Sequence, residues 1–148
     1  MTQIISGSDI STEIRAELRE KVSVLKSDYG VTPGLATVLV GSAPASQMYV
    51  GMKNKAAQAM GIHSEQLTLE TETSEEELLG AVEELNGNPE IHGILVQLPL
   101  PDHIDEARVI EAIDPSKDVD GFHPISVGRL ATGSAEYFAP CTPAGVVE

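Results

Sequence analysis

Short apolar runs alternate with helical stretches along this chain, and this alternation constrains the fold more than any other feature. Residues 35–40 and 91–96 are rich in β-branched side chains, as is typical of strands buried on both faces. Residues 62–69 are a further strand candidate. Apolar positions at helical spacing predict helices over residues 9–28, 44–60, 75–87 and 104–113. Because helices between strands imply right-handed crossovers, we predict an α/β fold, a three-layer sandwich with a mostly parallel sheet (βαβαβα).

Three details of these helices can be predicted. The first helix has Asp9 or Ser11 as a possible N-cap, and the third begins at Thr73 or Ser74, before a run of glutamates. In the helix over residues 44–60, Tyr49 and Lys53 are expected at the margin of the buried face. That face is predicted to consist of Met48, Met52, Ala56 and Ala59.

Composition excludes several function classes. The 148 residues suit one domain, and 23 acidic against 9 basic residues give a formal net charge of −14. Such a surface repels nucleic acids and anionic membranes, so neither is an expected partner. The single cysteine, Cys141, excludes an internal disulfide, and the chain shows no long apolar run or signal pattern, so we expect a cytoplasmic protein. No metal site is expected from the scattered histidines, His63, His92, His103 and His123.

Tyr49 and Lys53 are one helical turn apart and share a face. A tyrosine ring can hold a flat substrate while a neighbouring amine takes part in proton transfer. A partly buried ring beside a solvated charge is the commoner explanation of this spacing. The pair therefore indicates a site only together with other residues.

Gln97 follows the strand over residues 91–96 directly. In parallel sheets, ligands bind beyond the carboxyl ends of the strands, and the helix that carries Lys53 starts at the same edge. We therefore expect Gln97 and Lys53 on one rim, where the amide can hydrogen-bond the lysine and fix its direction. The alternative is a polar residue that merely satisfies a loop.

Residues 114–122 contain aspartates next to a glycine, which usually mark a turn. Calcium binding is rejected because the twelve-residue loop with a closing glutamate is absent. A third possibility is that the Asp120 carboxylate accepts paired N–H donors from a heterocycle, while Gly121 allows a close backbone approach.

Four motifs occur in order along the chain: Ala45-Ser46-x-x-Tyr49-Val50-x-x-Lys53-x-Lys55-Ala56, Gly93-Ile94-Leu95-Val96-Gln97-Leu98-Pro99-Leu100-Pro101, Pro115-x-Lys117-Asp118-Val119-Asp120-Gly121-Phe122 and Pro140-Cys141-Thr142-Pro143-x-Gly145. Together they closely resemble the bifunctional methylenetetrahydrofolate dehydrogenase/methenyltetrahydrofolate cyclohydrolase family. The resemblance spans residues 45–145.

The resemblance implies an enzyme that oxidises 5,10-methylenetetrahydrofolate with NADP (or NAD) and hydrolyses the methenyl product to 10-formyltetrahydrofolate. By matching position, Lys53 would be the central catalytic group, Gln97 its partner, and Tyr49 a catalytic residue that stacks on the folate. Asp120 would anchor the pterin. Further substrate contacts are implied for Ser46, Val50, Val96 and Leu98. The resemblance implies no metal, and it implies a homodimer for the full-length enzyme.

The chain departs from the family pattern in one respect. The family continues into a Rossmann-type NAD(P) domain, whereas this sequence stops at Glu148 and contains no Gly-x-Gly-x-x-Gly. Residues 1–140 are therefore expected to be the folate-binding catalytic domain, and residues 141–148 the start of a helix that leads to an absent cofactor domain. We expect no dehydrogenase activity and weak or no hydrolysis from this chain alone, and no cofactor-binding residue in it.

Three other interpretations of the sequence compete with this family. A short-chain dehydrogenase also uses Tyr-x-x-x-Lys, but it needs a glycine-rich turn, which residues 41–44 do not provide. A receiver-like signalling module needs an aspartate where this chain has Gln97. A non-enzymatic folate-binding or structural domain stays open on the sequence alone.

Overall fold

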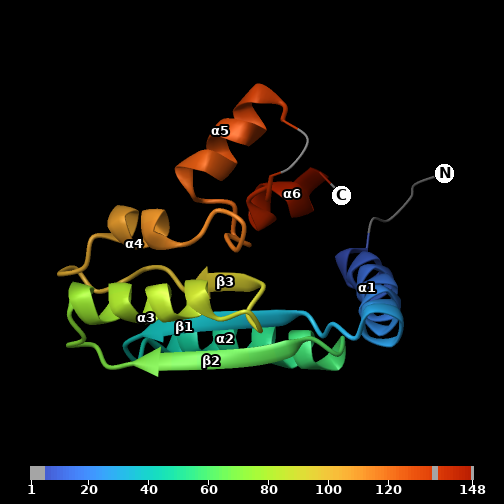
Figure 1. Cartoon of the computed structure of the whole chain (residues 1–148), viewed down its shortest axis with the longest axis horizontal. Coiled ribbons are helices and arrows are strands. Elements are labelled where there is room, and N and C mark those ends of the chain that lie inside the picture. The colour runs from blue at the N-terminus through green and yellow to red at the C-terminus, as the bar shows by residue number, and fades with distance from the viewer. Residues whose placement is uncertain (1–5, 135–136, 148) are drawn as a thin grey trace.

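The computed structural model describes residues 6–134 and 137–147 of the chain (Figure 1). It confirms the predicted alternation of strands and helices. The elements are α1 (Gly7–Tyr29), β1 (Gly34–Val40), α2 (Pro44–Ala59), β2 (His63–Leu69), α3 (Glu75–Gly87), β3 (Gly93–Val96), α4 (Glu106–Ala112), α5 (Pro124–Thr132) and α6 (Cys141–Val147).

The sheet has three parallel strands in the order β2-β1-β3. The central strand β1 is buried along most of its length, and its Val38 pairs with Leu67 on one side and Val96 on the other. Beyond β3, an isolated parallel bridge joins Ile94 to Asp118. This bridge attaches the segment after α4 to the edge of the sheet. The predicted α/β class with a parallel sheet is thus confirmed.

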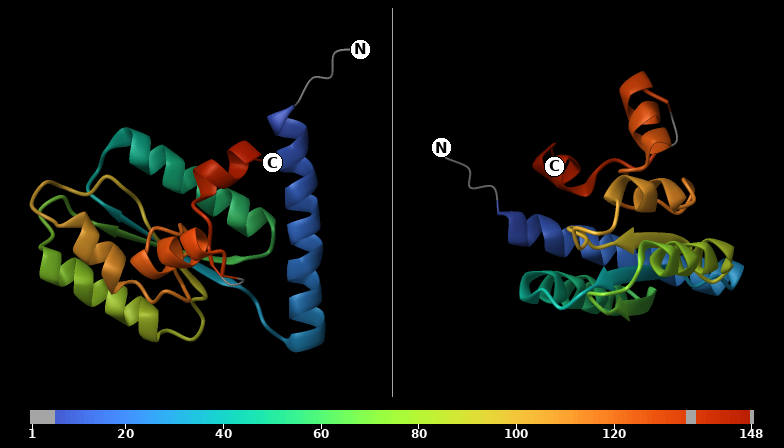
Figure 2. Two further views of the ribbon diagram at one scale, coloured as in Figure 1. Left: turned by 90° about the horizontal axis from the view of Figure 1, so that it is seen from above. Right: turned by 90° about the vertical axis from the view of Figure 1, so that its left-hand side faces the viewer.

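The two faces of the sheet are covered by different helices. In the left view of Figure 2, α2 lies on one side of the sheet, and α3 with α4 on the other. Alternate residues of β1 point towards α3 and α4, and the main core forms there. Its largest fully buried members include Val38, Leu78, Val82, Ile94 and Val109.

The prediction for the buried face of α2 is wrong. Met48 and Met52 are 58% and 51% exposed, whereas Ser46, Val50 and Ala57 are buried against the sheet. Both sets of residues have helical periodicity, so periodicity alone could not choose between them. The buried set has the smaller side chains, which let the helix axis lie close to the strands.

Helix ends follow local chemistry. The N-cap of α1 is Ser6, whose side chain accepts a hydrogen bond from the Asp9 N–H, so the prediction of Asp9 or Ser11 is wrong. Ser74, one of the two residues predicted to begin α3, caps this helix in a full capping box with Glu77. Helix α5 was not predicted. Helix α6 matches the expected helix over residues 141–148, except that Glu148 lies outside the described residues.

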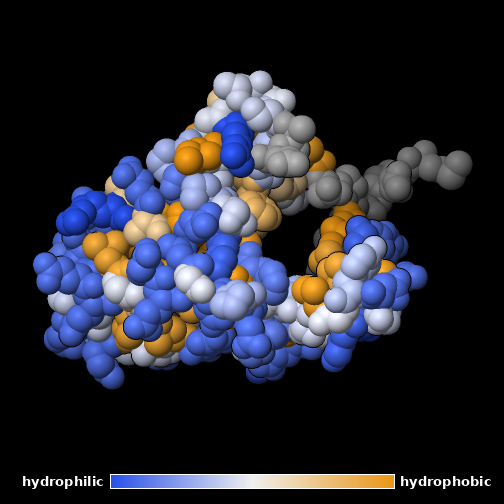
Figure 3. All heavy atoms as spheres, viewed as in Figure 1, coloured by the Kyte–Doolittle hydropathy of each residue, from blue (hydrophilic) through white to orange (hydrophobic). Residues whose placement is uncertain are grey.

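Helices α1, α5 and α6 lie around the body of the molecule, which is formed by the sheet with α2, α3 and α4. Helix α1 lies beside the end of the sheet at which β1 begins, where the Arg19 Nε donates to the Ala59 carbonyl at 3.1 Å. Helices α5 and α6 lie above β3 in Figure 1. In the same view, Figure 3 shows an open hollow between α1 and the body. None of the helices in the described ranges is both long enough and apolar enough to cross a membrane.

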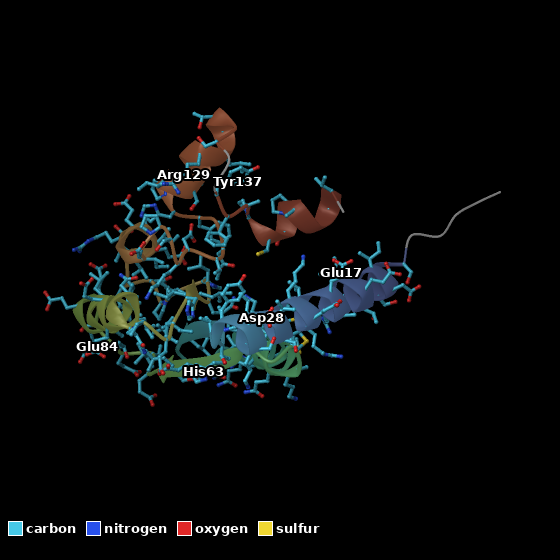
Figure 4. The ribbon with its side chains drawn as sticks, turned by 45° about the vertical axis from the view of Figure 1, so that its right-hand side comes forward. Glu17, Asp28, His63, Glu84, Arg129 and Tyr137 are labelled. Carbon is cyan, nitrogen blue, oxygen red and sulfur yellow. The ribbon has the colours of Figure 1, made fainter. Side chains whose placement is uncertain are left out.

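Acidic side chains are spread over the molecule. Figure 4 shows Glu17 and Asp28 on α1 and Glu84 on α3, and all three are exposed. The negative charge is therefore distributed over separate helices.

Candidate active site at the edge of strand β3

Lys53 on α2 and Gln97, the residue after β3, lie together. The Lys53 Nζ donates to the Gln97 Oε1 at 3.2 Å, and both side chains are half-buried. This hydrogen bond confirms that the two residues share one rim of the sheet.

The orientation of the Gln97 amide follows from its other contacts. The Gln97 backbone N–H continues the sheet ladder by donating to the Val38 carbonyl at 2.8 Å. Its side-chain Nε2 donates to the Leu98 carbonyl at 2.7 Å. Since the amide nitrogen already has an acceptor, the amide oxygen is the atom left to face the lysine.

Asp120 is the third polar residue of the site. Its half-buried carboxylate is near Lys53 and Asp118. Burial raises the pKa of Asp120 above its usual range; the positive charge of Lys53 opposes this shift, and the negative charge of Asp118 adds to it. An enclosed partner with N–H donors would therefore stabilise the charged form of Asp120.

Lys53, Gln97 and Asp120 line one cavity of about 1010 Å³. The cavity runs from Gln97 across the face of the sheet to Gly34, between α2 and the segment over residues 138–143. Most of its wall is apolar, with few polar groups, as in typical small-molecule sites. We expected the site only beyond the carboxyl ends of the strands, but this cavity extends back to the amino end of β1.

Two of the other predicted site residues, Val96 and Leu98, also line the cavity. Three do not. Tyr49 is 53% exposed and lies outside the lining, while Ser46 and Val50 are only 7% and 0% exposed, in the contact between α2 and the sheet. Their proposed substrate contacts stay predictions.

The family model for "Tetrahydrofolate dehydrogenase/cyclohydrolase, catalytic domain" matches residues 5–120. The chain belongs to this family. It is 58% identical over 147 residues to bifunctional protein FolD 2 of Geobacter sulfurreducens, a match that covers 99% of this chain and 51% of the relative.

Solved structures of the family share the fold. The bifunctional FolD enzyme of Campylobacter jejuni superposes with a TM-score of 0.93 at 50% identity, over 95% of this chain and 50% of that one. The Trypanosoma brucei FolD dehydrogenase-cyclohydrolase, solved with NADP and an inhibitor, gives 0.94 at 37% identity, over 99% of this chain and 50% of that one. The chain spans about half the length of the family members that it matches.

Aromatic residues of the cavity were missed from the sequence. Both phenylalanines of the chain, Phe122 and Phe138, line it. In a chain with 3% aromatic residues, the two phenylalanines next to family motifs were a usable signal.

Cys141 is exposed and also lines the cavity, with its Sγ 3.7 Å from the Val119 carbonyl.

Among the residues that the structure describes, the start of α2, the helix that carries Lys53, is not a dinucleotide cradle. The turn before α2 has Ala43 as its N-cap, without a side-chain hydrogen bond, and Pro44 removes one of the free N–H groups that bind phosphate at a helix start. Across residues 6–134 and 137–147, no group of three or more His, Cys, Asp or Glu side chains could hold a metal ion.

Proposed function

We propose that this chain carries the folate site and the catalytic lysine of a one-carbon enzyme. The enzyme oxidises 5,10-methylenetetrahydrofolate to 5,10-methenyltetrahydrofolate with NADP, and hydrolyses the latter to 10-formyltetrahydrofolate. The observation that carries the proposal is the joint placement of Lys53, Gln97 and Asp120 in one cavity. Membership of the family and the activities for which the FolD relatives are named support it.

Lys53 serves the hydrolysis as acid and base. Methenyltetrahydrofolate is a cation, and water adds to its one-carbon bridge while the neutral Lys53 amine accepts one proton. The adduct then collapses. Its hydroxyl proton goes to solvent, Lys53 returns its proton to ring nitrogen N5, the bond from carbon to N5 breaks, and the formyl group stays on N10. Gln97 aims the amine by its hydrogen bond.

Asp120 anchors the substrate. Its carboxylate accepts the paired N–H donors of the pterin, and such a charge-assisted pair is strong in a half-buried site. Tyr49, one turn before Lys53, is proposed to cover the folate ring once substrate is bound, although its side chain is exposed in this structure.

NADP is proposed as the cofactor of the full-length protein, on the strength of the T. brucei relative. It supplies the hydride acceptor for the oxidation. Because the residues described here do not fit its pyrophosphate, we derive no step through it. A cytoplasmic location and a homodimer of the full-length protein belong to the proposal as well.

The test is titration of the 148-residue chain with 5,10-methenyltetrahydrofolate, followed by hydrolysis rates in the full-length protein. We expect saturable binding, weakened by about tenfold or more with Asp120→Asn and kept with Asp102→Asn, whose side chain is exposed. Lys53→Met should abolish hydrolysis, and the matched Lys55→Met, on the exposed side of α2, should leave it unchanged. Absence of saturable binding, or normal hydrolysis by Lys53→Met, refutes the proposal.

A further inference from the structure

We infer that Asp118 is a positioning residue for the substrate, because its buried carboxylate holds the loop over residues 119–123 in the shape that presents Asp120 to the cavity. The inference rests on the proposed folate site and concerns the same motif. In the site described above, Asp118 enters only as a negative charge near Asp120.

Asp118 is 1% exposed, and the described hydrogen bonds of its carboxylate are with residues that follow it along the chain. Its Oδ1 accepts from the N–H groups of Gly121 and Phe122, at 3.0 and 3.4 Å. Its Oδ2 accepts from the His123 N–H at 3.0 Å and from the Ser126 Oγ at 2.8 Å. One carboxylate thus closes the loop and joins it to the first turn of α5.

The backbone at this point is tied to rigid elements. The Ile94 N–H donates to the Lys117 carbonyl at 2.8 Å, next to the bridge between Ile94 and Asp118. The Lys117 Nζ donates to three carbonyls at the end of α3, those of Leu85, Asn86 and Asn88, at 2.7–3.1 Å. Because the backbone of Asp118 is fixed to the sheet in this way, its carboxylate holds the loop in a defined position relative to the sheet.

The loop over residues 119–123 positions two parts of the cavity wall, its own residues and the segment at Phe138. Asp120 and Phe122 flank Gly121 and both line the cavity. Gly121 has a φ of +69°, and a Cβ there would clash with the Phe138 carbonyl oxygen, so the outgoing chain passes directly over it. Phe138 also lines the cavity. A shift of the loop would therefore displace the anchor carboxylate and both aromatic side chains together.

Asp118→Asn is the sharpest perturbation, because it keeps the size of the side chain. It replaces either Oδ1 or Oδ2 by an NH₂ group. Since both oxygens accept from backbone N–H groups, the new NH₂ group would face an N–H donor in either orientation. Buried donors without an acceptor are costly, so the loop is expected to rearrange. Ser126→Ala is a milder variant, since it removes one of the four donors and leaves the three backbone N–H groups in place.

The experiment is a double-mutant cycle on binding of 5,10-methenyltetrahydrofolate to the chain. We expect Asp118→Asn and Asp120→Asn each to weaken binding by about tenfold or more, and the double variant to bind no more weakly than Asp120→Asn alone, within about twofold. Asp102→Asn serves as the control. Fold losses that multiply in the double variant, or wild-type binding by Asp118→Asn, overturn the inference.

Two further measurements keep the inference testable. In the full-length protein, Asp118→Asn should raise KM for methenyltetrahydrofolate while kcat falls less, a split that general destabilisation does not produce. If Asp118→Asn does not fold, Ser126→Ala must weaken binding and speed amide exchange at Gly121 and His123; wild-type values of both overturn the inference. If the wild-type chain binds no folate, the proposed function fails, while the exchange rates still test the loop.

Discussion

The Lys53 Nζ lies 3.2 Å from the Gln97 Oε1, although 44 residues separate them along the chain. The parallel pairing of β1 with β3 produces this contact, because it brings the end of β3 to the helix that follows β1. The amide of Gln97 is neutral. It can therefore direct the lysine amine without holding it in the charged form.

Gln97→Glu tests this neutrality. A carboxylate at the same place favours the protonated lysine. We expect hydrolysis of methenyltetrahydrofolate by the full-length protein at neutral pH to fall by about tenfold or more, and its pH–rate profile to move to higher pH. The matched control is Gln47→Glu, which adds the same charge at an exposed position of α2. An unshifted profile in Gln97→Glu would contradict the role given to the amide.

Asp120→Asn is expected to separate stability from binding. Burial raises the pKa of Asp120 in the folded state, so its contribution favours folding below its ordinary pKa and is lost as the pH rises through the raised value. At neutral pH the variant should be slightly more stable, by less than about 1 kcal/mol because solvent screens the charge. The gain should shrink as the pH falls and disappear below about pH 3, where the wild-type carboxyl is also neutral in both states.

The readouts are thermal melts over this pH range and folate titrations at neutral pH. Asp102→Asn should change neither. A loss of stability in Asp120→Asn at neutral pH would show that the half-buried carboxylate has a partner that compensates its burial.

Ser74→Ala tests the cap of α3, whose residues are outside the cavity lining. The Ser74 Oγ and N–H form a reciprocal capping box with Glu77. We expect a loss of about 1 kcal/mol in the free energy of unfolding, measured by urea denaturation. Ser23→Ala, at an exposed position within α1, should be close to neutral.

The same cap has a pH dependence. Hydrogen bonds from the backbone and side chain of Ser74 lower the pKa of Glu77 below 4.5. A lowered pKa in the folded state adds stability above the ordinary value, and this stability is lost as the pH falls through the lowered one. The difference between wild type and Ser74→Ala should therefore shrink below about pH 4. A constant difference would mean that Glu77 does not take part.

Val50→Ala and Met52→Ala test which face of α2 is buried. Val50 is fully buried and Met52 is 51% exposed. We expect the valine variant to lose about 2 kcal/mol of unfolding free energy and the methionine variant less than about 0.5 kcal/mol. The reverse order, which the sequence pattern predicted, would contradict the packing described above.

Local patterns were sufficient for much of the architecture. The strand over residues 35–40, the helix over residues 75–87 and the cap at Ser74 depend on neighbours along the chain, so the sequence predicts them. Parallel topology then predicts that Lys53 and Gln97 meet. The residues around Asp120 suggested its role, and resemblance to a known family added the cavity residues Val96 and Leu98. Neither could tell that Val50 belongs to the core.

By itself, the sequence determined the order of the elements, their local ends and the chemistry available at the rim of the sheet. Only the tertiary structure decided the rotation of α2, the course of the segment over residues 138–143 along the cavity, and the use of Asp118 as the centre of a loop. The physical reason is that these features depend on contacts between segments distant along the chain. Several arrangements satisfy the local hydrogen bonds and periodicity equally well, and close packing of the whole chain selects one of them.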